Sequence, residues 1–504
     1  MASVTTLPAH TRVEHRELSD SMDRVREELE KVRSSPDADN VHDLRVAIRR
    51  CRSVAKVFEE IDPDPAWPEM RKTAQKLFRA LGALRDSHVL AERINSLASA
   101  SDPVRVHMLG LLEAEEPKLR DEVLRVAGKF DGKAWEHLQR RLRQRVRFIP
   151  VGGLAAECLA WERFEEIKQL HAHALRSSKA KPWHELRIGL KKLRYTVEAL
   201  LPVHYAAWSE NLKRLQDLLG DIHDFDVLAE KVKGQTELPG AARKSWKDNL
   251  QEERGKRVQT YRQLTLGKTS IGNKWRHALP HGARLEAASF ARLQAAARAA
   301  QSRPRKAARV ARISLRVFDL LRRAGAAPLF AEPNMRRELR AAALLHGVGQ
   351  DAKHPRKAAR KFLLGMTVPP RWTREDWELV AWAVRFHRGA EPSASNEKFT
   401  ALSPFEQAQI RALAGVIRLG RVLHKCGVES ATGFRIEKSE EAVTLSIPKL
   451  ADSVEAAATL AAGKHLLETA LGKAVVLRAA ETKSKVVALP APREVLYAVA
   501  GASD

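Results

Sequence analysis

The chain has 504 residues and carries 88 Lys and Arg against 62 Asp and Glu, a formal net charge of +26. This length predicts roughly two to four domains, each large enough for its own core. The charge predicts an anionic partner, such as nucleic acid, an acidic membrane surface or a phosphate polymer, and an aromatic content of only 6% argues against the base-stacking platforms of single-strand binding proteins.

The cysteines and the apolar stretches indicate the compartment in which the protein works. Cys51, Cys158 and Cys426 are far apart and form neither a disulfide framework nor a metal-binding motif, which suits a reducing cytosol. Residues 1–20 lack the apolar segment of an export signal, and no window of about eighteen uncharged apolar residues occurs, so no membrane span is expected. We therefore expect a cytoplasmic protein.

The apolar periodicity of the first 150 residues is that of α-helices. Helices are predicted at about residues 17–33, 41–58, 67–97, 103–128 and 133–148. Asn40 is a candidate N-cap for the second of these helices, and the Pro- and Gly-containing segment 149–153 ends the series.

The second helix carries a basic stripe. Its cations recur at steps of three and four residues, so they lie on one face, beside an apolar stripe that includes Leu44 and Ile48. The stripe consists of His42, Arg45, Arg49, Arg52 and Lys56, with Arg50 next to it. Shorter basic faces follow on later helices: Lys72, Lys76 and Arg79, and then Arg140, Arg143 and Arg147. A solvated basic face is the ordinary alternative to a binding surface for such patterns.

An internal duplication decides between these interpretations. The segment 183–195 matches the basic helix in register, because His184 follows His42 by 142 residues. The further correspondences are Arg45 with Arg187, Arg49 and Arg50 with Lys191 and Lys192, and Arg52 with Arg194. A second marker, Leu81–Glu92, returns as Leu219–Glu230, so two markers recur in the same order.

The duplication predicts two pseudo-symmetric helical bundles packed as one domain over about residues 10–270, with half-repeats at about 15–150 and 151–270. The duplicated helices should face each other, so that their basic stripes line a shared channel. We expect this channel to be narrower than duplex DNA requires and better matched to a thin linear polyanion.

These repeated motifs resemble those of the CHAD family, the helical domains named for conserved histidines. The motifs are VHxLRVxxRRxR and WHxLRIxLKKLRY, each followed by LGxxRD or LGDxHD. The resemblance implies a helical bundle whose basic central groove binds inorganic polyphosphate, and it assigns the basic positions of both motifs to that groove. Cys51 and Gly189 depart from the family pattern, because a larger apolar residue is usual at both positions.

The chemistry of the stripe suits such a ligand. Arg and Lys bind phosphate oxygens through charge-assisted hydrogen bonds, and a histidine in the same row can donate as well. His42 and His184 can equally be histidines near a helix start that bond to the backbone. Association with polyphosphate granules or with polyphosphate-metabolising enzymes is compatible with this ligand, whereas a membrane partner is not expected and nucleic acid is the less favoured polyanion.

The C-terminal half resembles a second family. Residues 271–304 are predicted as a linker. Just before it, Gly267-Lys268-Thr269 is similar to the end of a P-loop, but the upstream glycine of that motif is missing, so nucleotide hydrolysis is not expected. Residues 305–428 are similar to the HD-type helical region of exopolyphosphatase and guanosine-pentaphosphatase proteins. Residues 429–504 read as a small α/β tail with a strand, a helix over 453–471 and a second strand.

The departures from the HD pattern predict that this half is not catalytic. An HD site needs a His-Asp pair on a metal, but here the sequence is His346-Gly347, and Gly420-Arg421 stands where a further Asp is usual. His354 is followed by Lys357 and Arg360 rather than by more histidines, so Arg356, Lys357, Arg360 and Lys361 form a candidate second anion patch. The ATPase half of that family is not present in this sequence. We expect no catalytic residue, no metal and no cofactor.

Three functions remain open from the sequence. The favoured one is non-enzymatic binding of inorganic polyphosphate in the basic channel. The alternatives are a metal-dependent phosphohydrolase acting on polyphosphate or guanosine pentaphosphate, and a nucleic-acid-binding protein.

Overall fold

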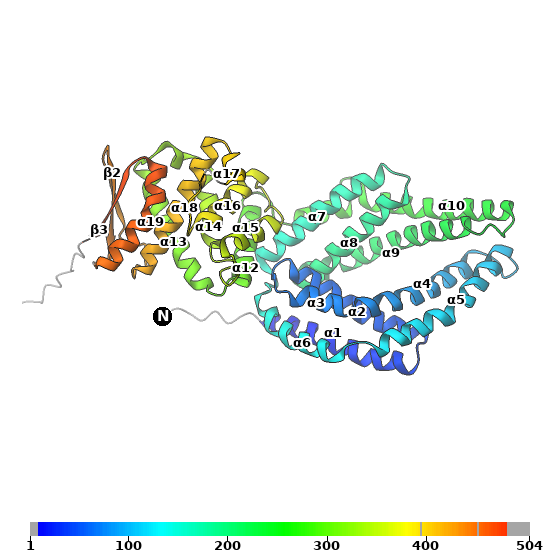
Figure 1. Ribbon diagram of the computed structural model, residues 1–504. Coiled ribbons are helices and arrows are strands. Elements are labelled where there is room, and N and C mark those ends of the chain that lie inside the picture. The colour runs from blue at the N-terminus through cyan, green and yellow to red at the C-terminus, as the bar shows by residue number, and fades with distance from the viewer. Residues whose placement is uncertain (1–8, 394–395, 451–452, 481–504) are drawn as a thin grey trace, which may run out of the picture. The chain divides into compact units, whose positions relative to one another are not determined.

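The computed structural model describes residues 9–393, 396–450 and 453–480, and these are mainly α-helical, with one three-stranded sheet near the C-terminal end (Figure 1). The predicted fold class is confirmed. The chain divides into two compact units. Unit 1 comprises residues 1–304 and 344–381, and unit 2 comprises residues 305–343 and 382–504. Within the described residues, no helix combines the length and apolarity needed to cross a membrane.

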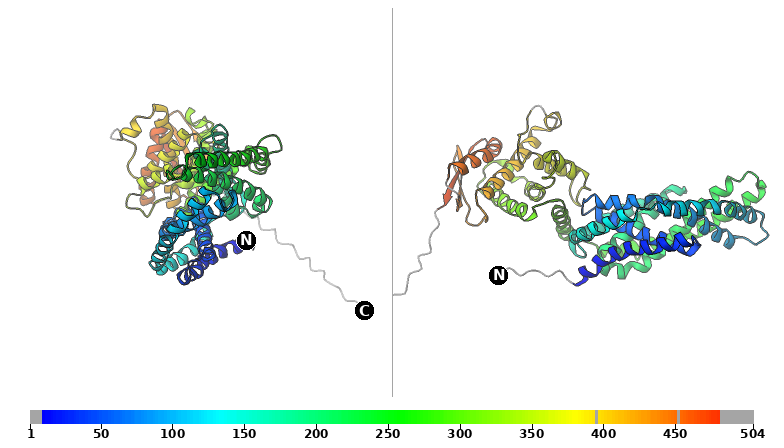
Figure 2. Two further views of the ribbon diagram at one scale, coloured as in Figure 1. Left: turned by 90° about the vertical axis from the view of Figure 1, so that its right-hand side faces the viewer. Right: turned by 60° about the horizontal axis from the view of Figure 1, so that its bottom comes forward.

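Unit 1 contains both half-repeats of the duplication. The first half consists of α1 (Ala9–Ser34), α2 (Ala38–Glu59), α3 (Ala66–Thr73), α4 (Gln75–Leu97), α5 (Pro103–Gly128), α6 (Gly132–Arg145) and the short 3-10 helix η1 (Val146–Phe148). The second half consists of α7 (Gly153–Leu175), α8 (Ala180–Leu200), α9 (Pro202–Lys233), α10 (Gly240–Thr265) and α11 (Ile271–Ala278). Helices α2 and α8 pack against each other, as do α5 and α10, so the two halves meet along their length (Figure 2).

Two helix boundaries differ from those predicted. Asp37 rather than Asn40 caps α2, because its carboxylate accepts the backbone N–H of Asn40 at 2.8 Å. The helix predicted over 67–97 is divided at Ala74 into α3 and α4, whereas the matching part of the second half is the single helix α9.

Buried apolar stripes fix the orientation of the two basic helices. On α2, Leu44, Ile48 and Cys51 are fully buried, and on α8 Leu186 and Leu190 are buried in the same core. Because these residues face inward, the basic residues one step around each helix lie half-buried at the edge of the core. The orientation of the basic stripes therefore follows from hydrophobic burial.

Gly189 has a packing role that explains its departure from the family pattern. A Cβ at this position would lie 2.7 Å from Cδ1 of Leu170 on α7, so a side chain at residue 189 would require Leu170 to shift. Cys51 fills a fully buried position of the core, where a small apolar side chain is sufficient.

Residues 271–304, predicted as a linker, contain two helices, α11 and α12 (Gly282–Ala300). A third repeated marker is visible here: Gly132, Trp135 and His137 recur as Gly272, Trp275 and His277. Trp275 is buried and stacks on the ring of Trp208 with the ring centroids 5.3 Å apart. Helix α11 is thus the counterpart of α6.

Helix α12 packs on α7 through charged pairs rather than apolar contacts alone. Arg284 donates to the buried carboxylate of Glu157 at 2.8 Å, and Arg292 forms a buried ion pair with Glu162. Removing one partner of the buried Arg292–Glu162 pair would cost about 3–5 kcal/mol. These pairs make α12 an integral part of unit 1.

The remaining elements complete the C-terminal half. They are α13 (Pro304–Arg323), η2 (Pro328–Ala331), α14 (Met335–Leu345), α15 (Pro355–Gly365), α16 (Arg374–Phe386), α17 (Glu397–Thr400), α18 (Pro404–Lys425), β1 (Arg435–Lys438), β2 (Ala442–Pro448), α19 (Val454–Leu471) and β3 (Ala474–Ala480). The sheet order is β1-β2-β3, with β1 antiparallel to β2 and β2 parallel to β3. The predicted strand, helix and strand of the tail are therefore present, and β1 is an additional strand.

Candidate functional site

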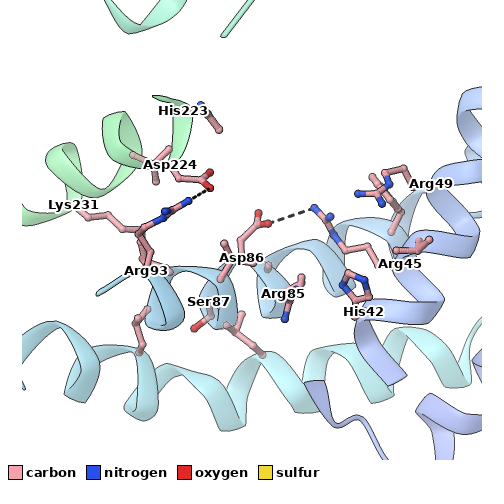
Figure 3. A pocket seen from close by; sticks show the side chains of 18 of the residues that line it. His42, Arg45, Arg49, Arg85, Asp86, Ser87, Arg93, His223, Asp224 and Lys231 are labelled. Carbon is pink, nitrogen blue, oxygen red and sulfur yellow. Dashed lines mark hydrogen bonds and ion pairs between the residues drawn. The ribbon is translucent and has the colours of Figure 1, made fainter. Parts of the chain in front are cut away.

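A cavity of about 730 Å³ lies in unit 1 among α2, α4, α5, α8 and α9. Its lining contains seven Arg and Lys side chains against the carboxylates of Asp86, Glu115 and Asp224. The cationic members are Arg45, Arg49, Arg85, Arg93, Arg187, Lys191 and Lys231, and the histidines are His42 and His223 (Figure 3). The cavity is therefore strongly cationic.

The duplication places equivalent residues around this one cavity. Each of five positions of the first half has its repeat-related partner in the same lining. The pairs are Arg45 with Arg187, Arg49 with Lys191, Arg85 with His223, Asp86 with Asp224, and Arg93 with Lys231. Both half-repeats thus contribute the same kinds of side chain, so the cavity offers cations from two sides.

The side chain of Arg45 packs against the ring of Phe78 and next to Gly82. Its guanidinium lies over the ring of Phe78, 5.3 Å from the centroid, and its nitrogens lie 3.7 Å from where a Cβ of Gly82 would be. In the described part of the chain its acidic partner is Asp86, whose Oδ1 is 3.4 Å away and whose side chain is 75% exposed (Figure 3). An exposed pair at this distance stabilises little, so Arg45 retains donors for another anion.

Burial among cations perturbs the groups deepest in the cavity. The pKa of Lys191 falls to about 8, first because the ammonium is buried and then because Arg187, Arg49 and Arg45 lie near it. Burial also lowers the pKa of Arg45 and of Arg187. Cations packed together at this cost mark a site that an anion would stabilise.

Two histidines of the second half, His184 and His223, lie together beside the same cations. Nδ1 of His184 is 3.3 Å from Nδ1 of His223, so one ring donates to the other. The pKa of His223 falls to about 4, first through burial and then through Arg187, His184 and Lys191. His223 is therefore neutral at pH 7 and can donate or accept a hydrogen bond.

Arg93 connects the two half-repeats across the cavity. From α4 it forms an ion pair with Asp221 of α9, lies 3.8 Å from a carboxylate oxygen of Asp224, and stacks over Phe225 at 5.2 Å from the ring centroid. Burial raises the pKa of Asp224, and Arg187 and Arg93 oppose that shift. This network holds α4 and α9 at a fixed separation.

A second cavity of about 200 Å³ continues from the first, because Val46 and Arg49 line both. Arg50, Arg194 and Tyr195 also line it, and Arg194 is oriented by a hydrogen bond of 2.8 Å to Oε1 of Gln216. Arg49 therefore stands at the junction of two cationic cavities between α2 and α8.

Other residues of the predicted site lie outside both linings. Lys192 pairs with Glu166 of α7 at 2.5 Å, and burial followed by the charge of Lys192 lowers the pKa of Lys56. Arg52 lies over Phe78 but donates to the backbone carbonyl of Arg71. The exposed residues that line neither cavity are Lys72, Lys76, Arg79, Arg140, Arg143 and Arg147.

The sequence analysis did not select the residues that α4 and α9 contribute. These are Arg85, Asp86, Arg93, His223, Asp224 and Lys231. Most of them belong to the repeated element that follows the basic helix in each half. The repetition of this element was the feature of the sequence from which these residues could have been predicted.

The HD-like positions of the C-terminal half are crowded. A Cβ at Gly347 would lie 2.7 Å from Oε1 of Gln301, and a Cβ at Gly420 would collide with Oγ of Ser314. An Asp would not fit at either position without rearrangement of its neighbours. His346 and His387 are buried, and among the described residues no group of three or more His, Cys, Asp or Glu side chains is placed to hold a metal.

Comparison with known proteins gives two family matches. Residues 17–233 match the CHAD domain, and residues 297–468 match the Ppx/GppA phosphatase, domain III. Among solved structures, the chain matches the crystal structure of the CHAD domain from the plant Ricinus communis, with 20% identity, a TM-score of 0.39, and coverage of 50% of this chain and 90% of that chain. No curated protein matches the chain.

Proposed function

We propose that this protein, in which residues 17–233 are a CHAD domain and residues 297–468 a Ppx/GppA phosphatase domain III, binds inorganic polyphosphate between α2 and α8 without cleaving it. The observation that carries the proposal is the lining of one cavity by repeat-related cations of both halves. A linear polyanion can contact both sides of such a cavity at once.

The residues suit phosphate in particular. Arg45, Arg49 and Arg187 each present a planar fork of donors that matches phosphate oxygens, and Lys191 adds a point charge between them. His223 is neutral at pH 7, so it adds a hydrogen bond without further charge repulsion. A hydrogen bond to a charged phosphate group contributes about 1.5–3 kcal/mol to the binding free energy.

The second part of the proposal is that the C-terminal half does not hydrolyse phosphate. Metal-assisted hydrolysis at an HD site requires carboxylate ligands, and glycine occupies both positions, 347 and 420, at which the sequence comparison expects them. The assay is phosphate release from polyphosphate and guanosine pentaphosphate with Mg²⁺ or Mn²⁺. Release that is lost in His346→Ala would instead establish the phosphohydrolase alternative.

The binding test is a calorimetric titration with long-chain polyphosphate. Arg49→Glu combined with Lys191→Glu places two negative charges in the cavity, and binding should fall at least a hundred-fold, from about 1.5–3 kcal/mol per lost contact. The matched control is Lys72→Glu with Lys76→Glu, which changes the net charge equally on an exposed face outside the cavity. Equal losses in both variants would refute the cavity as the binding site.

Salt dependence and competition experiments distinguish polyphosphate binding from the remaining alternative, nucleic-acid binding. Binding should weaken as salt rises, and the cavity variant should show a shallower salt slope because fewer counterions are released. Duplex DNA or RNA that displaces polyphosphate at equal phosphate concentration would favour a nucleic-acid-binding protein.

A further inference from the structure

Unit 2 contains a polar cavity of its own, remote in sequence from the basic helices. It has a volume of about 460 Å³ and lies between α13 and the segment that joins α18 to β1. Its lining consists of Arg312, Arg316, Glu429, Ser430, Ala431, Thr432 and Gly433. This volume falls within the range of small-molecule sites, but the lining is polar rather than apolar.

The charges around this cavity favour an anion. Arg309, one helical step before Arg312, pairs with Glu429 at 3.1 Å and so neutralises the one carboxylate of the lining. Arg316 donates from Nη2 to the carbonyl of Phe434 at 3.1 Å, which orients its guanidinium and leaves its other N–H groups. Arg312 is exposed, and in the described part of the chain it has no ion pair or hydrogen bond.

The loop opposite the arginines has a defined shape and a spare donor. The hydroxyl of Ser430 donates to Oγ1 of Thr432 at 2.9 Å and accepts the backbone N–H of Thr432 at 3.2 Å. Gly433 has a φ of +81° and lies against Pro448, where a Cβ would be 2.9 Å from Cγ of the proline. Thr432 lines the cavity, and because its Oγ1 accepts the hydrogen bond from Ser430, its own hydroxyl proton is still available.

We infer that this cavity is a second anion site, which binds a small phosphate-bearing ligand through Arg312, Arg316 and the hydroxyl of Thr432. Two guanidinium groups supply paired N–H donors that match phosphate oxygens, and a hydroxyl supplies a further donor. All residues that line this cavity belong to unit 2. The site can therefore bind its ligand in a variant in which the cavity between α2 and α8 no longer binds polyphosphate.

The first experiment uses the unmodified full chain. Phenylglyoxal modifies accessible arginines, and peptide mass spectrometry reports the rate at each. Tripolyphosphate should slow the modification of Arg312 and Arg316 but not of Arg322, an exposed arginine of α13 that does not line the cavity. Equal protection of Arg312 and Arg322, or protection of neither, would overturn the inference.

The second experiment separates this site from the cavity between α2 and α8. In the Arg49→Glu, Lys191→Glu background, residual binding of pyrophosphate and tripolyphosphate should weaken about ten-fold or more on Arg312→Glu and less than two-fold on Arg322→Glu. Long-chain polyphosphate titrated in parallel shows whether the site accepts only short ligands or also the end of a polymer. No residual binding in this background, or the same loss in both variants, would contradict a second site.

Discussion

The protonation of Lys191 should make polyphosphate binding depend on pH. Its pKa is about 8 in the free protein against an ordinary value of 10.5, because the ammonium is buried beside Arg187, Arg49 and Arg45, with Asp224 opposing them. A bound phosphate chain stabilises the charged form and raises this pKa, so the complex holds more protons than the free protein above pH 8. The affinity should therefore fall as the pH rises from about 8.

The size of the change in affinity with pH follows from the difference between the pKa of Lys191 in the free protein and in the complex. If phosphate restores the ordinary pKa, the affinity falls by roughly 80-fold between pH 8 and pH 10.5, which corresponds to about 2.6 kcal/mol. At pH 8.5 binding should take up about three quarters of a proton, since that fraction of Lys191 is deprotonated beforehand.

Calorimetry in buffers of different ionisation enthalpy measures this proton uptake directly. Lys191→Met should remove most of it and flatten the pH profile, whereas Lys76→Met, on an exposed face outside the cavity, should leave both unchanged. The reasoning fails if the wild-type protein takes up no proton at pH 8.5, or if Lys191→Met takes up as much as the wild type.

Three further predictions test the site and the fold. Asp86→Asn removes a carboxylate that pairs weakly with Arg45, so polyphosphate binding should tighten several-fold in a titration; weaker binding would mean that Asp86 orients Arg45. Gly189→Val forces a side chain onto Leu170 and should lower the free energy of unfolding by about 1–3 kcal/mol in urea; an unchanged midpoint would contradict the close packing of α7 and α8. Trp275→Ala should cost about 3–5 kcal/mol in the same assay if α11 belongs to the second half-repeat, and a loss below about 1 kcal/mol would assign it to a linker.

The helical period and the duplication were enough to predict the basic helices and the residues of α2 and α8 that share a cavity. Arg45, Arg49, Arg187 and Lys191 lie together because burial of the apolar stripes turns the basic stripes the same way in both halves. Periodicity indicates which residues share a face of a helix, and burial of the adjacent apolar stripe fixes where that face points.

The position of a side chain within a stripe depends on neighbours that periodicity does not describe. Arg52 belongs to the same stripe as Arg49, yet it donates to the carbonyl of Arg71, because α3 packs beside this turn of α2. The basic face of α6, which includes Arg140 and Arg143, has a helical pattern as regular as that of α2. It is nevertheless exposed and lines neither cavity, because the position of α6 in the fold does not follow from its periodicity.

The contributions of α4 and α9 required the tertiary structure. Arg93 reaches Asp221 and Asp224 of the other half-repeat, and such a contact depends on how two distant segments pack. The helices within residues 271–304 were missed for a different reason: the marker around Trp275 is short, and its buried partner Trp208 lies 67 residues earlier in the chain. Local composition cannot show that such a tryptophan is buried.

The most direct measurement is a crystal structure of the protein with a short polyphosphate bound. The proposal predicts phosphate groups in the cavity between α2 and α8, with Arg49 and Lys191 in contact with their oxygens. A polyphosphate chain held instead by the exposed arginines of α6, with the cavity between α2 and α8 free of phosphate, would contradict it.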